Sequence, residues 1–308
     1  MPSPPSKRRP LGDRLFGIGL PLLGAALLVL ALVIFFSCFK LSRPALAKIG
    51  VLHFFFGRDW NPVQDSFGAL AFVYGTLVTS LVAMVLALPV SVGLALFLTE
   101  MAPRRIRTLV ATLVQVLASI PSVVYGLWGL MVLVPLLRSP VEPWLTHWFG
   151  FLPVFGGPPI GLGYLAAGII LSIMILPTIA SVTVEVLRTM PSVLREGALA
   201  LGATRWEAIR LVVLPYARRG IWGAAILGLN RALGETMAVT MVIGNQPEIH
   251  TSLFSPGYTL PSVIANEFAE AGGDIHTGAL AALALALFFV SLCVSATARY
   301  FIRATRSA

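Results

Sequence analysis

The chain has 308 residues, of which 57% are hydrophobic and only 11% are charged. A soluble globular domain carries roughly a quarter charged residues, so this composition excludes that class and indicates a protein embedded in a bilayer. The formal net charge of +9 could suggest nucleic-acid binding. The basic residues instead lie in short clusters between apolar runs, as membrane topology requires. We therefore expect membrane lipid as the surroundings and no nucleic-acid partner.

Six apolar stretches are long enough to cross a hydrocarbon layer of about 30 Å, which takes about 20 helical residues. They are residues 15–39, 72–98, 108–137, 161–184, 220–244 and 278–298. The first is too long for the apolar region of a signal peptide, so we expect a retained anchor. The sequence predicts an all-α integral membrane protein with six transmembrane helices. Residues 15–71 would hold the first helix and a periplasmic segment, and residues 72–298 a core of five helices.

Most of the 22 lysines and arginines lie on one side of this predicted topology. That side receives the tails 1–14 and 299–308, the connection 104–107 and the segment 188–219. The opposite side holds Lys40, Arg43, Lys48, Arg58 and Arg138. Because basic connections stay in the cytoplasm, we expect both termini and the segment 190–215 to be cytoplasmic.

The sequence has no motif for nucleotide hydrolysis. A P-loop requires a Gly-Lys pair, and none of Lys7, Lys40 and Lys48 follows a glycine. The GxSxG and HExxH motifs are also absent. Cys38 and Cys293 lie in apolar runs without a CxxC neighbour. We expect a chain that is not an enzyme and that binds no cofactor or metal.

Two charged residues fall inside the predicted span 220–244. Arg231 lies near its middle, where a charge costs about several kcal/mol unless it faces protein or a wet cavity. Glu235 follows four residues later, which on a continuous helix places both side chains on one face, able to pair. Two interpretations stay open: an ion pair that fixes helix packing, or a solute path in which Arg231 attracts an anion. In the second, Asn230 and Thr236 extend the polar side.

The segment 190–215 is polar, basic and interrupted by glycine. Small and apolar residues recur on one helical face over 192–201, and Gly202 suits the left-handed C-terminal cap. The pattern T-x-x-E from Thr204 is a capping box that begins a second helix, and Pro215 is expected to end it. This predicts two short helices joined by a sharp turn. Its small face, bordered by Arg195, suits a groove in another protein.

The same segment resembles the EAA loop, E-A-A-x3-G-x9-I-x-L-P, of ABC-importer permeases. The residues that match its positions are Glu196, Gly197, Ala198, Gly202, Leu214 and Pro215. Gly197 replaces the first alanine and Val212 the isoleucine. The stretches 121–130, 228–240 and 266–271 resemble the phosphate-specific permease subunits of these importers. The resemblance runs from about Tyr74 to the last span.

The resemblance implies a type I importer fold with cytoplasmic coupling helices in a bacterial inner membrane. It implies four further subunits: a homologous second permease, two cytoplasmic P-loop ATPases that use ATP and Mg, and a periplasmic phosphate-binding protein. The EAA-type residues would couple to the ATPases, and Arg231 and Glu235 would be critical for transport. A single fixed cation does not distinguish phosphate from sulfate or molybdate. An ATPase-independent secondary transporter and a receptor that only senses also stay open.

Overall fold

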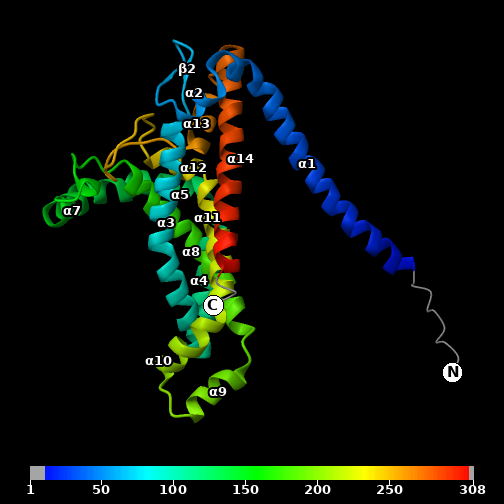
Figure 1. Cartoon of the computed structure of the whole chain (residues 1–308). Helices are drawn as coiled ribbons and strands as arrows, with labels where there is room; N and C mark the ends of the chain where they lie inside the picture. The colour runs from blue at the N-terminus through cyan, green and yellow to red at the C-terminus, as the bar shows by residue number, and fades with distance from the viewer. Residues whose placement is uncertain (1–10, 305–308) are drawn as a thin grey trace.

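A computed structural model describes residues 11–304 of the chain (Figure 1). The N-terminal half contains α1 (Leu11–Ile49), α2 (Val51–Phe56), β1 (Trp60–Asn61), β2 (Ser66–Phe67), α3 (Leu70–Leu96), α4 (Arg104–Ser119), α5 (Ser122–Trp128), α6 (Val134–Leu136) and α7 (Glu142–Phe149). The C-terminal half contains α8 (Tyr164–Arg188), α9 (Ser192–Ala200), α10 (Arg205–Ala208), α11 (Leu214–Leu233), α12 (Met237–Val242), α13 (Leu260–Glu267) and α14 (Gly273–Ala304).

Short irregular helical turns join several of these elements. Four are π-helical, η1 (Phe97–Met101), η2 (Gly129–Leu133), η3 (Leu137–Val141) and η5 (Ile209–Val213), and η4 (Pro153–Phe155) is a 3₁₀ turn. The predicted all-α architecture is therefore confirmed, with one two-stranded antiparallel hairpin, β1–β2, as its only sheet among residues 11–304. Residues 1–10 and 305–308 of the expected tails lie outside the described residues, and α14 continues through 299–304.

Five helical segments in the described chain are long and apolar enough to span a membrane. They are Gly19–Ile49, Leu70–Met101, Ser122–Phe149, Tyr164–Arg188 and Gly273–Tyr300. The predicted span 220–244 is not among them, because the helix is interrupted between α11 and α12 and the 20 residues of α11 include Arg218, Arg219 and Arg231. The predicted span 108–137 is divided as well. Ile120 is extended before Pro121, which disfavours a helical residue ahead of it and lacks an amide hydrogen.

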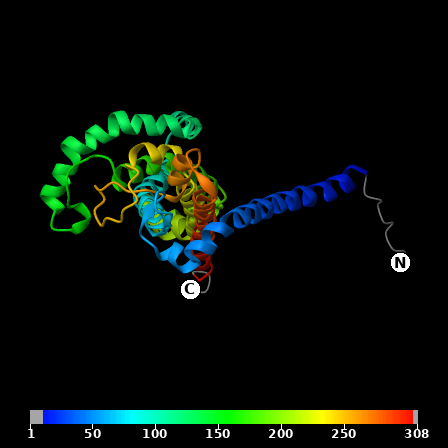
Figure 2. The same cartoon turned by 90° about the horizontal axis from the view of Figure 1, so that it is seen from above.

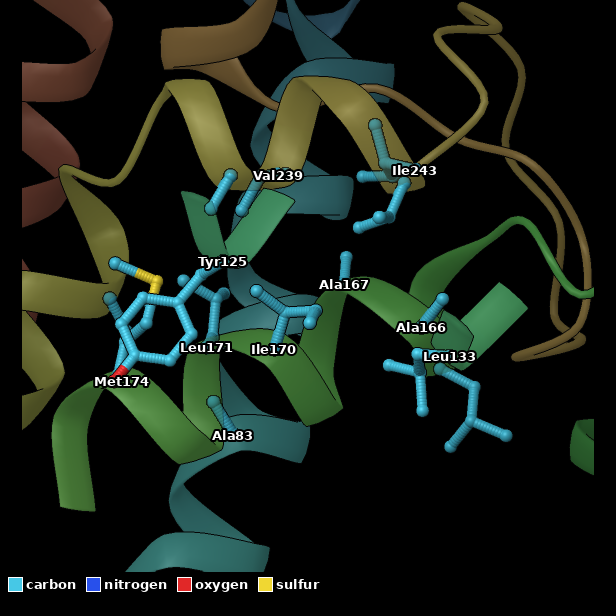
Figure 3. Close-up of a cluster of buried hydrophobic side chains, with 14 of the residues drawn as sticks. Ala83, Tyr125, Leu133, Ala166, Ala167, Ile170, Leu171, Met174, Val239 and Ile243 are labelled. Carbon is cyan, nitrogen blue, oxygen red and sulfur yellow. The ribbon is translucent and has the colours of Figure 1, made fainter. Parts of the chain in front are cut away.

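Helix α8 forms the centre of the bundle, with 61% of its most apolar window buried. It packs along α3 and α11, and glycines at the crossings let the backbones come close. A methyl group at Gly168 would meet Val82 of α3, and one at Gly228 would meet Ile179 of α8. Figure 3 shows Ile170 and Leu171 of α8 with Tyr125 of α5 and Val239 of α12 in the largest buried apolar cluster. Small residues at helix contacts are the usual packing device in membranes.

Helix α1 leaves the bundle and extends away from it (Figures 1 and 2). None of its most apolar window is buried within this chain. Only its C-terminal part packs, where Ala45 is fully buried against Gly278 of α14. Three small residues of α14 that lie three and four positions apart, Ala279, Ala282 and Ala286, are all buried. The segment α4–α7 curls away on the other side of the bundle (Figure 2).

The two ends of the bundle differ in structure. We name the end that carries α9 and α10 the α9 end, and the end that carries β1 and β2 the hairpin end (Figure 1). At the hairpin end, Trp60 donates a hydrogen bond to the carboxylate of Glu267 (2.9 Å), which also lies 3.1 Å from His276 Nε2. The ring of Phe67 stacks on His276. These contacts tie the hairpin to α13 and α14.

Candidate functional site

The α9–α10 element at the α9 end has the predicted helix, turn and helix. Gly202 has φ +90°, and the turn closes with amide hydrogen bonds from Ala203 to Ala198 (3.1 Å) and from Gly202 to Leu199 (3.0 Å). This is the Schellman pattern, which satisfies the last carbonyls of a helix. The next helix begins with the predicted capping box: Glu207 N donates to Thr204 Oγ1, and Thr204 N to the Glu207 carboxylate.

Apolar side chains of this element face outward. No residue of α9 is buried, and Leu201 at the turn is 91% exposed. Other large exposed apolar residues here are Val193, Leu194, Leu199 and Trp206. Glu196 is exposed, a Cβ at Gly197 would meet open space, and Ala198 is half-buried. Exposed groups of large apolar residues mark sites of interaction with another protein or with a membrane.

Arg195 does not belong to this outward surface. Its guanidinium turns toward the bundle and lies 2.6 Å from Oε1 of Glu100 in η1. The sequence placed Arg195 at the border of the small face, and the structure shows that it pairs with the bundle instead of adding to the outward surface. No local pattern reports the pair, because its members are 95 residues apart.

The predicted helix end at Pro215 is wrong. Pro215 lies in the first turn of α11, and the helix continues to Leu233. Proline is tolerated there because the preceding π-helical turn η5 changes the hydrogen-bond register: the amide of Leu214 donates to the carbonyl of Ile209, five residues back. Leu214 is half-buried beside the apolar cluster of Ile209, Val213 and Leu187, and Pro215 is exposed.

The predicted polar residues Arg231, Glu235 and Thr236 meet at the break between α11 and α12. Arg231 is in the last turn of α11 and exposed, while Glu235 and Thr236 lie in the interruption and are half-buried. Among the ion pairs of the described residues, none joins Arg231 to Glu235. Instead, Oε1 of Glu235 accepts a hydrogen bond from Ala238 N (3.4 Å). The predicted continuous helix face, on which the two would pair, does not exist because α11 ends at Leu233.

Asn230 points away from this group. Its Oδ1 accepts a hydrogen bond from Ser295 Oγ of α14 (2.8 Å). Adjacent residues on a helix point about 100° apart, so Asn230 and Arg231 face different neighbours. The structure thus separates Asn230 from the other three predicted path residues, at a hollow of about 420 Å³ that Ser291 and Arg299 also line.

A second broken helix packs beside the first. Tyr125 of α5 donates a hydrogen bond to the carbonyl of Leu117 in α4 (2.8 Å), across the interruption at Pro121. The Arg231 guanidinium is close enough to the Tyr125 hydroxyl to interact with it electrostatically. Gly126 lies against Ala238 of α12 with no room for a Cβ. Sequence reasoning missed Tyr125, although PSVVYG was among the stretches with a family likeness.

The arrangement is chemically specific. The α4–α5 and α11–α12 interruptions lie side by side through α5 and α12, and the guanidinium of Arg231, which has no ion pair among the described residues, lies at the second interruption with the carboxylate of Glu235. Interrupted backbone at membrane depth is tolerated where it is buried in protein or lines a wet cavity. A fixed positive charge in such surroundings attracts an anion more strongly than it would in water.

Comparisons with known proteins agree with this geometry. A family model described as "Binding-protein-dependent transport system inner membrane component" matches residues 87–307. The "Phosphate transport system permease protein PstC" of Mesorhizobium japonicum is 49% identical over 284 residues, covering 90% of this chain and 86% of the relative. The protein of that name from Pasteurella multocida is 49% identical over 253 residues, covering 81% and 79%.

A more distant relative covers nearly the whole chain. The "Probable phosphate transport system permease protein PstC" of Methanocaldococcus jannaschii is 37% identical over 295 residues, covering 94% of this chain and 93% of the relative. At this coverage the match includes most of α1 and the hairpin end of this chain.

Solved structures share the fold at low sequence identity. A chain of a bacterial alginate ABC transporter aligns with a TM-score of 0.61 and 18% identity, covering 94% of this chain and 97% of that chain. A chain of the inward-facing MetNI methionine ABC transporter aligns with a TM-score of 0.55 and 21% identity, covering 77% and 94%. The expected type I ABC-importer permease fold is confirmed. By its family match and its relatives, this chain belongs to the binding-protein-dependent transport system inner membrane components, among the PstC-type permeases.

Proposed function

We propose that this chain is a permease subunit of an ATP-driven importer of inorganic phosphate. The observation that carries the proposal is the protruding α9–α10 element, which presents an EAA-type sequence and an outward apolar surface at one end of a membrane bundle. Its relatives of nearly equal length are named phosphate transport permeases. This chain has no P-loop, so the energy of ATP enters through other subunits.

The proposed complex contains a second, homologous permease, two cytoplasmic P-loop ATPases that use ATP and Mg, and a periplasmic phosphate-binding protein. In this assembly the α9 end is cytoplasmic in a bacterial inner membrane, with both termini on the same side. The excess of arginine near 104–107 and 188–219, compared with the opposite connections, supports this orientation.

The proposed mechanism is alternating access. ATP binding draws the ATPases together and moves α9, on which Glu196, Gly197, Ala198 and the turn at Gly202 form the contact. Leu214 and Pro215 begin α11, so this movement passes directly into the helix whose last turn carries Arg231. The interrupted helices then rearrange, so that the path through the bundle, which was open to one side of the membrane, opens to the other. Arg231 attracts the anion, Glu235 limits how tightly it is held, and Thr236 extends the polar side of the path.

The test is uptake of labelled inorganic phosphate by the complete complex in proteoliposomes. We expect Arg231→Gln to assemble normally and to lower uptake about tenfold or more, because losing a hydrogen bond to a charged group costs about 1.5–3 kcal/mol. Arg43→Gln, on α1 far along the chain from the break, is the matched control and should leave uptake unchanged. Undiminished uptake by Arg231→Gln would refute the path role.

The same vesicles test the substrate and the energy source. Competition with sulfate and molybdate decides which oxyanion is carried, because charge alone does not separate them. ATP-dependent uptake that requires the P-loop subunits is expected. Uptake that proceeds without them would instead identify a secondary transporter, and ligand-dependent signalling without uptake would identify a receptor.

A further inference from the structure

The ion pair between Glu100 and Arg195 joins two parts of the chain that no local pattern connects. Arg195 Nη2 lies 2.6 Å from Glu100 Oε1, and the side chain of Glu100 is only 6% exposed. Of the ion pairs among residues 19–300, whose side chains the structure describes, this one alone joins α9 to another element. A carboxylate so far removed from water is costly unless it is paired, which makes the pair sensitive to the loss of either partner.

The backbone around Glu100 is specialised to hold this carboxylate. Glu100 lies in the π-helical turn η1 at the end of α3, where the amide of Ala102 donates to the carbonyl of Phe97 (2.8 Å). The guanidinium of Arg107 in α4 donates to the carbonyls of Thr99 (3.5 Å) and Ala102 (3.4 Å). Single π-helical turns often occur at functional sites, because the additional residue redirects a side chain.

Little else attaches α9 to the bundle. None of its residues is buried, and a hollow of about 420 Å³ lies between α9 and the bundle. Glu100, Met101, Arg195 and Leu199 are among its lining residues. Apolar packing therefore does not fix the angle of α9, and the charged hydrogen bond is its main side-chain attachment.

We propose that Glu100 is a positioning residue that acts through Arg195 to connect α9 mechanically to α3. This inference rests on the proposed function, in which α9 receives movement from the ATPases. One end of α9 continues through α10 into α11, and the Glu100 pair supplies a second connection, into α3. Ser91 of α3 in turn donates a hydrogen bond to the carbonyl of Leu176 in α8 (3.2 Å). When α9 is connected both to α11 and to α3, its movement displaces the bundle. When the Glu100–Arg195 pair is lost, part of that movement is no longer transmitted.

The experiment measures phosphate transported per ATP hydrolysed, using the complete complex in proteoliposomes. We expect Glu100→Gln and Arg195→Gln each to lower this ratio about tenfold, within the range of about 5–150-fold that is usual for coupling between sites. The ATPase subunits should still co-purify, because the outward surface of α9 is unchanged. The charge exchange Glu100→Arg with Arg195→Glu should recover much of the ratio, since it restores an ion pair of opposite polarity.

Arg188→Gln is the matched control. It removes an i,i+3 pair with Glu185 at the same end of the bundle, but both of those side chains are more than half exposed. Exposed pairs contribute little, so its transport ratio should equal that of the wild type. A ratio within about twofold of the wild type for Glu100→Gln, or a charge exchange no better than the single variants, would overturn the proposal.

A structural readout separates this inference from the proposed function. Spin labels at Val193 of α9 and Met101 of η1, both exposed, report the distance between the two elements. The labels are placed in a background that lacks Cys38 and Cys293. The distance distribution should be narrow in the wild type and broad in Glu100→Gln, even if the wild-type complex carries no phosphate. Identical distributions would refute the positioning role, whereas absent wild-type uptake would refute only the proposed function.

Discussion

Tyr258 at the hairpin end makes the free energy of unfolding depend on pH in the alkaline range. The pKa of Tyr258 is raised to about 12, mainly by burial; a hydrogen bond from Asn266 (2.9 Å) opposes this shift, and the nearby carboxylates of Glu267 and Glu270 add to it. The folded protein therefore favours the neutral phenol. Its contribution is fully present below the ordinary tyrosine pKa of about 10 and is lost as pH rises through about 12.

Tyr258→Phe removes both the titration and the acceptor for Asn266. We expect this variant to be less stable by about 1 kcal/mol at neutral pH, the usual net value of one hydrogen bond. The difference from the wild type should shrink above about pH 10. Thermal unfolding in detergent from pH 7 to 12 measures it, with the exposed Tyr216→Phe as control. A constant difference across the whole range would contradict the role of the buried phenol.

Spacing of residues along the chain predicts contacts only where the helix is continuous. Arg231 and Glu235 were identified from the cost of charge in a membrane, and the structure places them at the same interruption. Their expected pairing was wrong because α11 ends one residue before Gly234, which sends Glu235 toward the amide of Ala238. A lone glycine in an apolar helix is usually tolerated, so it gave no clear signal of a break.

Packing between α3 and α8 depends on the absence of a side chain at Gly168. A Cβ there would meet Cγ1 and Cβ of Val82, a β-branched side chain with little freedom to move. We expect Gly168→Ala to destabilise the protein by about 1–3 kcal/mol, as overpacking does. The matched control is Gly93→Ala on α3, where a Cβ would meet nothing within 4 Å. Unfolding midpoints in detergent should fall for the first variant and be unchanged or raised for the second.

The α9–α10 element was predictable because its signals are local. Gly202 at a left-handed position and the box from Thr204 to Glu207 define the turn and the second helix start through contacts within a few residues. The proline rule failed at Pro215 because η5 shifts the hydrogen-bond register just before it. Pairing of Arg195 with Glu100 lies beyond any such rule, since only the tertiary fold brings α9 to the end of α3.

The molecular class followed from composition, and five of the six predicted spans have a counterpart among the apolar helices. The first helix was predicted to end near residue 39, yet α1 continues to Ile49. Because Lys40, Arg43 and Lys48 are charged, we expected them to lie in the connection after the first helix. Long charged side chains at a membrane boundary can instead reach into water while the helix continues. Nor does apolarity distinguish a helix that packs, such as α8, from one that leaves the bundle, such as α1 (Figure 2).

The orientation of the whole molecule can be tested at two exposed positions. Val63 in the hairpin is 95% exposed and Leu201 at the α9–α10 turn is 91% exposed, and they lie at opposite ends of the bundle. If the basic α9 end is cytoplasmic, Val63→Cys should react with a membrane-impermeant maleimide in intact cells. Leu201→Cys should react only after the inner membrane is opened. Both variants are made without Cys38 and Cys293, and this cysteine-free parent is the control. The reverse labelling pattern would place α9 outside the cell, where no ATP is available, and would exclude the coupling mechanism.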